Sequence, residues 1–270
     1  KTNFTINNYA TNNIIRMNDK SITPLISVIT ATFNSQRFIL DTYKSLQAQS
    51  YKNWEWVVTD DASEDKTVSI LKELQSNDDR IKIFINADNK GAAWSRNNSM
   101  KESKGQYFAF IDSDDLWHPE KLSRQIAFMG DNIDFSFTSY ELVDVENKKL
   151  NKKIDITPIL PLTYHQMLRK KATLGCSTVI LRVSAFPDVR MPDLRTGQDY
   201  ATWLKILKRG TRAYLLPEVL TSYRIVNGSI SRNKFKKALR QWEIYRKYEN
   251  LSFLYSCYCF SLYAFRAVVR

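Results

Sequence analysis

Three carboxylates lie close together in the segment IDSDDLW (111–117) of this 270-residue chain, namely Asp112, Asp114 and Asp115. The apolar run YFAF comes just before them, so we expect little water around them. At ~6 Å and an effective dielectric near ~20, each pair of carboxylates repels by roughly 3 kcal/mol. A D-x-D pair can relieve this repulsion by binding Mg²⁺ or Mn²⁺, which keeps positions free for phosphate oxygens. The segment therefore predicts a metal–diphosphate site.

The same segment has two simpler interpretations. Asp residues favour helix N-caps, and the residues after Pro119 could form a helix. One Asp is enough for a cap, however, and three exceed that need. An EF-hand calcium loop is excluded because Leu116 stands at its fifth position and the turn glycine is missing.

Strands and helices alternate before the acidic segment. Four apolar, β-branched or aromatic runs predict strands, and the segments between them carry apolar residues at helical spacing, as Ile39, Tyr43 and Leu46 do. This alternation is typical of βαβ units on a parallel sheet, in an α/β fold. The predicted strands are LISVITA (25–31), WEWVVT (54–59), IKIFI (81–85) and YFAFI (107–111).

Polar residues follow each of these strands. In open parallel sheets, ligands bind beyond the carboxyl ends of the strands. The four following segments should therefore line one crevice: ATFN (31–34), DDAS (60–63), ADNKG (87–91) and DSDD (112–115).

The alternation breaks down after Asp115. We expect a mixed region with a helix over 198–208, and we expect the lysine-rich NKKLNKK (147–153) to be a solvated loop. The strands predicted for this region cover residues 133–140, 176–183, 213–217 and 222–226.

The two ends of the chain differ from its centre. Residues 1–23 are rich in Asn and Thr without periodicity, which predicts a poorly ordered arm. Residues 232–247 are basic and partly amphipathic, and residues 251–269 are aromatic and apolar. A basic segment beside an aromatic one suits peripheral membrane contact. A helix pair packed on the domain, or on a second subunit in a homodimer, is the alternative.

Composition narrows the function classes. The formal net charge is +12, and 43% of residues are hydrophobic, which is enough for a sizeable core. The basic residues are spread along the chain, so we expect phosphates or an anionic membrane as partners and no nucleic acid. The sequence contains no GxG and no CxxC, which excludes a Rossmann fingerprint and argues against zinc. Three poorly spaced cysteines favour a reducing, cytoplasmic compartment.

Five motifs, in this order, resemble the bacterial branch of glycosyltransferase family 2. The resemblance covers residues 24–230 and implies the GT-A (nucleotide-diphosphosugar transferase) fold with inversion at the anomeric carbon. It implies a nucleotide-sugar-binding half (24–115), an acceptor-binding half (116–230) and a helical C-terminal extension (231–270). The motifs are SVITATFN (27–34), DDAS (60–63), NKGAAWSRNN (89–98), FIDSDDLW (110–117) and GQDYATWLK (197–205).

The resemblance also assigns the donor site. It implies that Ala31, Thr32 and Phe33 line the nucleobase pocket, although the family usually has Pro at the first of these positions and often Tyr at the third. Asp61 would accept a hydrogen bond from uracil N3, and Asp60 is its less certain partner. The remaining donor-site residues are Gly91 at a helix N-terminus, Arg96 facing phosphate or Asp112, Asp112 and Asp114 as metal ligands, and Ser113 between them.

The resemblance also implies which residues form the acceptor site. Asp199, in the family's [EQ]D motif, would deprotonate the acceptor hydroxyl, and a helix N-cap is its structural alternative. Trp117 and Gln198 would contact the acceptor, and Asp115 would hold the acceptor or the donor sugar.

Together these features predict a metal-dependent inverting transferase at the inner face of the cytoplasmic membrane. We expect it to move a hexose or N-acetylhexosamine from a UDP-sugar to a saccharide acceptor, lipid-linked by family analogy, in surface polysaccharide (O-antigen or capsule) synthesis. A GDP-mannose user acting on a polyprenyl phosphate is the alternative within the fold. A non-catalytic polyanion- or membrane-binding module is the alternative from another class.

Overall fold

The computed structural model describes residues 23–226 and 234–269. The predicted N-terminal arm, apart from Thr23, lies outside the described residues.

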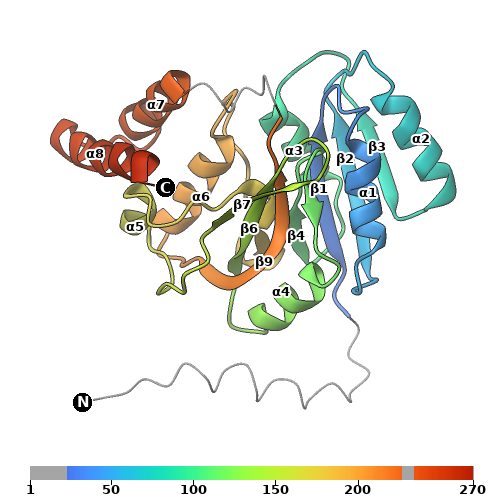
Figure 1. Cartoon of the computed structure of the whole chain (residues 1–270), viewed down its shortest axis with the longest axis horizontal. Helices are drawn as coiled ribbons and strands as arrows, with labels where there is room; N and C mark the ends of the chain where they lie inside the picture. The colour runs from blue at the N-terminus through green and yellow to red at the C-terminus, as the bar shows by residue number, and fades with distance from the viewer. Residues whose placement is uncertain (1–22, 227–233, 270) are drawn as a thin grey trace.

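The first half of the chain forms the predicted parallel sheet (Figure 1). Its four strands lie in the order β3-β2-β1-β4, and each neighbouring pair is parallel. They are β1 (Ile26–Thr32), β2 (Trp54–Asp60), β3 (Ile81–Ile85) and β4 (Tyr107–Phe110), connected by α1 (Ile39–Gln47), α2 (Thr67–Asn77) and α3 (Ala92–Lys101).

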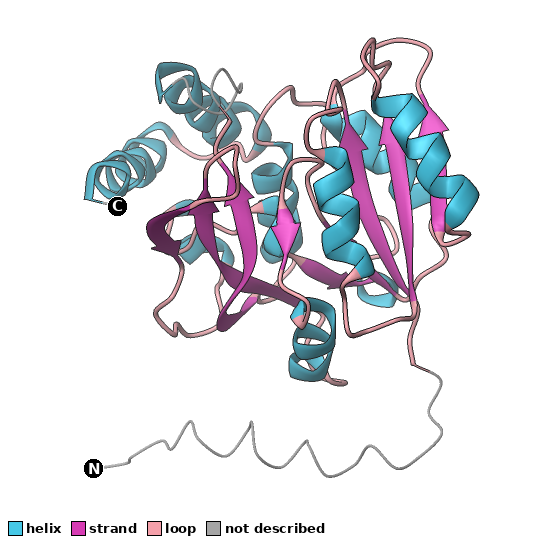
Figure 2. Ribbon diagram, turned by 45° about the vertical axis from the view of Figure 1, so that its right-hand side comes forward, coloured by secondary structure: helices cyan, strands magenta, loops and turns pink. Residues whose placement is uncertain are grey.

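Helices cover both faces of this sheet, and the period-2 alternation of the strands assigns their side chains to two cores (Figure 2). On β1, Val28 packs toward α1, α2 and α4 (Lys121–Met129), whereas Ile29 packs toward α3 and α6 (Gln198–Lys208). Burial on both faces explains why the first strands are almost wholly apolar.

The second half extends the sheet with mixed strand directions. β8 (Ile180–Arg182) is antiparallel to β4 and to β6 (Phe135–Val143), and β9 (Tyr214–Arg224) is parallel to β6. The edge strand β5 (Leu116–Trp117) is antiparallel to β9. The remaining helices of this half are α5 (Tyr164–Leu168) and the 3-10 turns η2 (Cys176–Thr178) and η3 (Val183–Ala185).

Two expectations for this half are wrong. The lysine-rich segment is an edge strand, β7 (Lys149–Ile154), paired with β6. Its first five residues are exposed, so it carries no alternating apolar pattern, and lysines are common on sheet edges. The two short strands predicted around residue 220 are one strand, β9, because the sequence break at Pro217 marks a register irregularity rather than a strand end.

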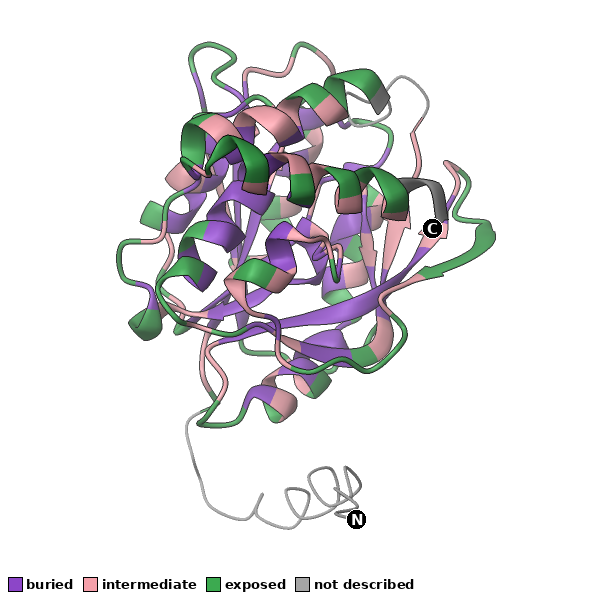
Figure 3. Ribbon diagram, turned by 90° about the vertical axis from the view of Figure 1, so that its left-hand side faces the viewer, coloured by how far each residue is buried: buried purple, intermediate pink, exposed green. Residues whose placement is uncertain are grey.

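The C-terminal helices pack on the domain (Figure 3). They are α7 (Lys234–Glu243), a π-helical turn (Ile244–Tyr248) and α8 (Phe253–Val269). The Tyr245 hydroxyl donates to the Leu168 carbonyl at 2.6 Å, and the Tyr164 hydroxyl donates to Glu249 at 2.6 Å. Among the helices of the described chain, none is long and apolar enough to cross a membrane.

Candidate functional site

The predicted crevice lies where the parallel strands end. Thr32, the last residue of β1, pairs in register with Asp60, the last residue of β2. Asn86 follows β3, and its backbone N–H donates to the Asp60 carbonyl at 2.9 Å. The acidic loop follows β4, which neighbours β1 on its other side. The loops after all four strands therefore meet at one edge of the sheet.

Arg96 brings a positive charge to the acidic loop. Its Nη2 donates to Asp112 Oδ1 at 2.5 Å, and its side chain is only 7% exposed. Burial alone would lower the pKa of Arg96, but the surrounding negative groups, Asp112 and Asp199 among them, raise it overall. Its Nε and Nη1 atoms are buried and have no hydrogen-bond partner within the described residues. Two charged donors are therefore left without a partner in the described chain, which is unusual unless a ligand completes them.

Asp112 and Asp114 have the chemistry expected of a divalent-cation site. Burial, followed by the neighbouring charge of Asp112, raises the pKa of Asp114 to about 6. A bound cation would offset the burial and the repulsion that raise this pKa. Within 23–226 and 234–269, no three His, Cys, Asp or Glu side chains are grouped so as to hold a metal by themselves. Mg²⁺ is commonly held by one or two carboxylates, substrate phosphates and water, so the pair fits a metal that arrives with a diphosphate.

Asp115 and Trp117 are held by hydrogen bonds within the domain, and Trp117 also lines the cavity described below. The acceptor contacts expected for them stay predictions. Asp115 is 1% exposed. Its Oδ1 accepts from the Arg224 backbone N–H at 2.9 Å, and its Oδ2 accepts from the Ser177 hydroxyl at 2.5 Å. Burial, then the charges of Asp114 and Asp112, raises the pKa of Asp115 well above its ordinary value. The Trp117 indole is buried and donates to the Ser177 carbonyl at 2.8 Å.

Ser177 is a connecting residue that the sequence reasoning missed. Its hydroxyl also accepts from the Asp112 backbone N–H at 3.0 Å, so it joins both ends of the acidic loop. It lies in the run CSTVIL, which predicts a strand and carries no signal of a site.

Asp60 and Asp61 organise their own loops. Asp60 is fully buried, and its carboxylate accepts from the Ser63 backbone N–H at 2.8 Å and from the Ser63 hydroxyl at 2.6 Å. The ligand contact expected for Asp60 stays a prediction. Asp61 accepts from the backbone N–H groups of Lys90 and Gly91 at 2.8 and 2.7 Å. It thereby fixes the loop that opens α3, and Gly91 at that N-cap has φ +92°.

The end of β1 carries the other donor-side residues. Ala31 and Thr32 are its last two residues, and Phe33 follows as a 46% exposed ring. The Thr32 hydroxyl is buried without a hydrogen-bond partner in the described chain. Ser113 lies against the same end of the sheet, since its hydroxyl is 2.7 Å from that of Ser35.

Asp199 lies in the first turn of α6. Gly197 is the N-cap, with φ +74° in the left-handed region, and no side chain caps the helix. Asp199 is half-buried, and burial raises the pKa of its carboxyl against the opposing charge of Arg96. Arg96 therefore forms an ion pair with Asp112, and its charge also acts on Asp199. The neighbouring Gln198 is buried with its Oε1 unpartnered in the described part of the chain.

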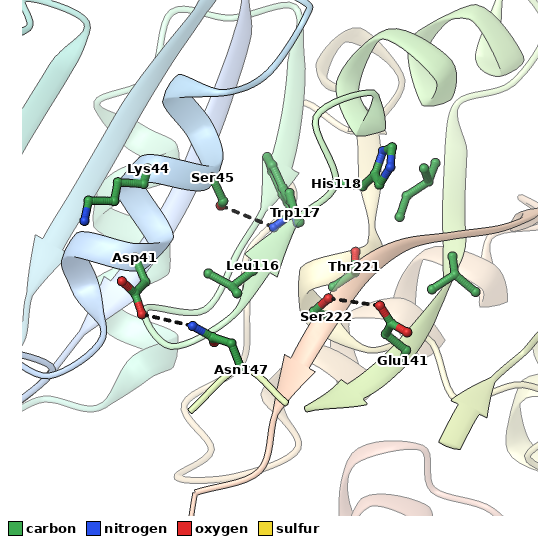
Figure 4. Close-up of a pocket in the computed structure, with 12 residues that line it drawn as sticks. Asp41, Lys44, Ser45, Leu116, Trp117, His118, Glu141, Asn147, Thr221 and Ser222 are labelled. Carbon is green, nitrogen blue, oxygen red and sulfur yellow. Dashed lines mark hydrogen bonds between the residues drawn. The ribbon is translucent and has the colours of Figure 1, made fainter. Parts of the chain in front are cut away.

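A cavity of about 390 Å³ lies beside the acidic loop, and sequence reasoning did not indicate it (Figure 4). Its walls come from α1, β5, β6 and β9. Asn147 donates to Asp41 at 3.4 Å and Ser222 donates to Glu141 at 3.5 Å across these walls. Its walls come from segments far apart in sequence, and of its lining residues only Leu116 and Trp117 belong to one of the five motifs.

Comparisons with known proteins agree with this geometry. The family described as Glycosyl transferase family 2 matches residues 27–189. TuaG of Bacillus subtilis (strain 168), a glycosyltransferase assigned to teichuronic acid biosynthesis, is 42% identical over 92% of this chain and 97% of its own length. WfgD of Escherichia coli, a UDP-Glc:alpha-D-GlcNAc-diphosphoundecaprenol beta-1,3-glucosyltransferase, is 37% identical over 82% of this chain and 85% of its own.

Solved structures show the same fold at low identity. S. aureus TarS 1-349 in complex with UDP-GlcNAc superposes with a TM-score of 0.67 at 22% identity, over 82% of this chain and 64% of that one. The mannosyltransferase PcManGT from Pyrobaculum calidifontis, in complex with GDP-Man and Mn²⁺, gives a TM-score of 0.67 at 17% identity, over 87% and 66%. With its parallel half-sheet, its acidic loop after β4 and its matched motifs, this chain belongs to glycosyl transferase family 2.

Proposed function

We propose that this glycosyltransferase moves a hexose or N-acetylhexosamine from a UDP-sugar to a hydroxyl of a lipid-linked saccharide, with inversion at the anomeric carbon. The observation that carries the proposal is the ion pair of Arg96 with Asp112, together with the effect of the Arg96 charge on Asp199. It supports a diphosphate-binding region and a candidate base in one crevice.

The donor would lie along the ends of β1, β2 and β4. Asp61 holds the loop before α3, and its Oδ2 accepts one hydrogen bond within the described residues, so it can still accept from the uracil imide. Arg96 Nε and Nη1 would complete their hydrogen bonds on phosphate oxygens. A UDP-sugar is supported by the TarS complex with UDP-GlcNAc and by the donor in the name of WfgD.

A divalent cation held by Asp112 and Asp114 would neutralise the charge of the departing nucleoside diphosphate. The PcManGT complex with Mn²⁺ supports a metal in a protein of this fold.

Asp199 would take the proton from the acceptor hydroxyl as that oxygen attacks the anomeric carbon. Its raised pKa suits a base that must accept a proton near neutral pH. Gln198, one residue before it, would present its unpartnered Oε1 to an acceptor hydroxyl. A diphosphoundecaprenol-linked acceptor, as in the name of WfgD, would place the enzyme at the inner face of the cytoplasmic membrane.

A donor screen tests this proposal. UDP release would be measured with UDP-Glc, UDP-Gal, UDP-GlcNAc and UDP-GalNAc, each with a saccharide-diphospholipid acceptor, and GDP release with GDP-mannose in parallel. We expect turnover with a UDP-sugar in Mn²⁺ or Mg²⁺ and its loss in EDTA. Turnover with GDP-mannose alone would overturn the donor assignment, and full activity in EDTA would overturn the metal role.

A further inference from the structure

The segment that connects β8 to α6 is fastened to α3. The Asn97 side chain of α3 donates to the Met191 carbonyl at 2.8 Å and accepts from the Met191 backbone N–H at 2.8 Å. Met191 and Leu194 are buried, and both belong to the same core cluster as Ala93 of α3. Two hydrogen bonds and two buried side chains therefore hold this segment along the helix before it reaches Arg195.

Arg195 lies across the residue that begins α3. A Cβ built on Gly91 would be 3.3 Å from Arg195 Nη1 and 3.9 Å from its Cδ. Gly91 is the N-cap of α3, and its backbone N–H donates to Asp61 Oδ2 at 2.7 Å. The Arg195 guanidinium therefore lies beside the loop that Asp61 fixes, on the donor side of the predicted crevice.

Arg195 is held in this place without an acidic partner. It is exposed, and it makes no hydrogen bond or ion pair with any other residue of 23–226 or 234–269. The neighbouring Lys90 is already engaged, with its Nζ 3.5 Å from Asp88. A guanidinium presents a rigid fork of N–H donors that matches the oxygens of a phosphate group. Arg195 is therefore available to a phosphate that enters the crevice.

The surroundings of Arg195 indicate which phosphate this is. Asp61 lies beside it and is the residue expected to bind the uracil of the donor. Asp199, the candidate base, follows Arg195 by four residues at the start of α6. A nucleotide-sugar with its uracil at Asp61 and its anomeric carbon near Asp199 has its diphosphate between the two. The donor diphosphate is therefore the anion that suits Arg195.

We infer that Arg195 binds the diphosphate of the donor nucleotide, beside Gly91 at the start of α3. This role rests on the proposed function and adds a second guanidinium to it. Arg96 would bind the phosphates from a buried position, and Arg195 from an exposed one. The segment that carries Arg195 continues directly into Asp199, so donor binding and the candidate base share one support.

Binding of UDP and of uridine to the full chain in Mn²⁺, measured by titration calorimetry, separates contact with the diphosphate from contact with the nucleoside. We expect Arg195→Gln to weaken UDP binding about tenfold, the size of one charge-assisted hydrogen bond, and to leave uridine binding unchanged. Arg195→Lys should recover part of the loss, because it keeps the charge but not the fork. Arg190→Gln, which removes another exposed arginine of the same segment, is the matched control and should bind both ligands as the wild type does.

Kinetics give a second readout. The KM for the UDP-sugar should rise about tenfold in Arg195→Gln, whereas the KM for the acceptor should stay unchanged. Equal UDP affinities of the wild type and Arg195→Gln would overturn the inference. An equal loss of UDP and uridine binding would also overturn it, since Arg195 would then support the nucleoside loop instead of binding phosphate. A rise in the acceptor KM alone would overturn it in favour of the diphosphate of the acceptor.

The same titrations with GDP and guanosine keep this inference apart from the proposed function. A wild type that binds GDP and not UDP would refute the UDP-sugar assignment alone, and a tenfold lower GDP affinity of Arg195→Gln would still support the role of Arg195. Thermal unfolding of each variant separates lost binding from lost folding, since exposed positions are expected to unfold near the wild-type temperature.

Discussion

Two glycines at opposite ends of α6 allow a matched test of how Asp199 is positioned. Gly197 precedes the helix with φ +74°, and Gly210 follows it with φ +93°. An alanine in the left-handed region costs about 1–2 kcal/mol, so Gly197→Ala and Gly210→Ala should lower the free energy of unfolding by similar amounts.

Their surroundings differ. A Cβ on Gly210 would meet nothing within 4 Å, whereas a Cβ on Gly197 would be 3.2 Å from Ile244 Cδ1. Either Ile244 or the turn before Asp199 must then shift by a few tenths of an ångström. Because a misplacement of about 1 Å can cost ~100-fold in rate, this smaller shift should cost about tenfold in kcat.

The assay is turnover at saturating donor, combined with urea unfolding of both variants. We expect Gly210→Ala to keep near-wild-type kcat at reduced stability and Gly197→Ala to lose about tenfold. Equal kcat values for the two variants at equal stability would refute the argument that the C-terminal helices position the base.

Three further predictions concern the crevice and its framework. Mn²⁺ with UDP should raise the unfolding temperature of the wild type but not that of Asp114→Asn. Asp131→Asn, a change at an exposed residue, is the control and should respond as the wild type does. An equal rise in all three proteins would argue against Asp114 as a metal ligand. Burial raises the pKa of Asp199, and a base must be ionised to act. The value of kcat/KM should therefore fall as the pH drops through that raised pKa. A fall of kcat/KM only in the ordinary pKa range of Asp would contradict the assignment of Asp199 as the base. Trp117→Phe should lower the free energy of unfolding by about 1 kcal/mol, through the lost hydrogen bond to Ser177, and leave kcat unchanged. A large loss of kcat at full stability would instead support the acceptor role expected for Trp117.

The sequence predicted the parallel half of the fold because its signals are local. Strands buried on both faces read as apolar runs, and the polar segments after them mark their carboxyl ends. The second half was harder, since β7 has an exposed lysine-rich pattern and β9 continues through Pro217. In both places pairing with β6 outweighs local propensity.

Residue types located the site but not the direction of each side chain. Arg96 pairs with Asp112, which is one of the two partners expected for it; the other is phosphate. Asp60 and Asp115 are acidic residues in the right loops, yet both are buried in hydrogen bonds to their own framework. Such a distinction depends on contacts between residues far apart in sequence, such as Asp115 with Arg224. The sequence did not predict that Ile244 lies next to Gly197, because these residues are also far apart in sequence.

The role of Asp199 as the base is tested by the transfer rate of Asp199→Asn at saturating UDP-sugar, compared with that of the wild type. The asparagine keeps the size of the side chain and removes its ability to accept a proton. The account predicts a loss of about 10²- to 10⁴-fold in kcat with unchanged UDP affinity. Turnover within a few-fold of the wild type would contradict it.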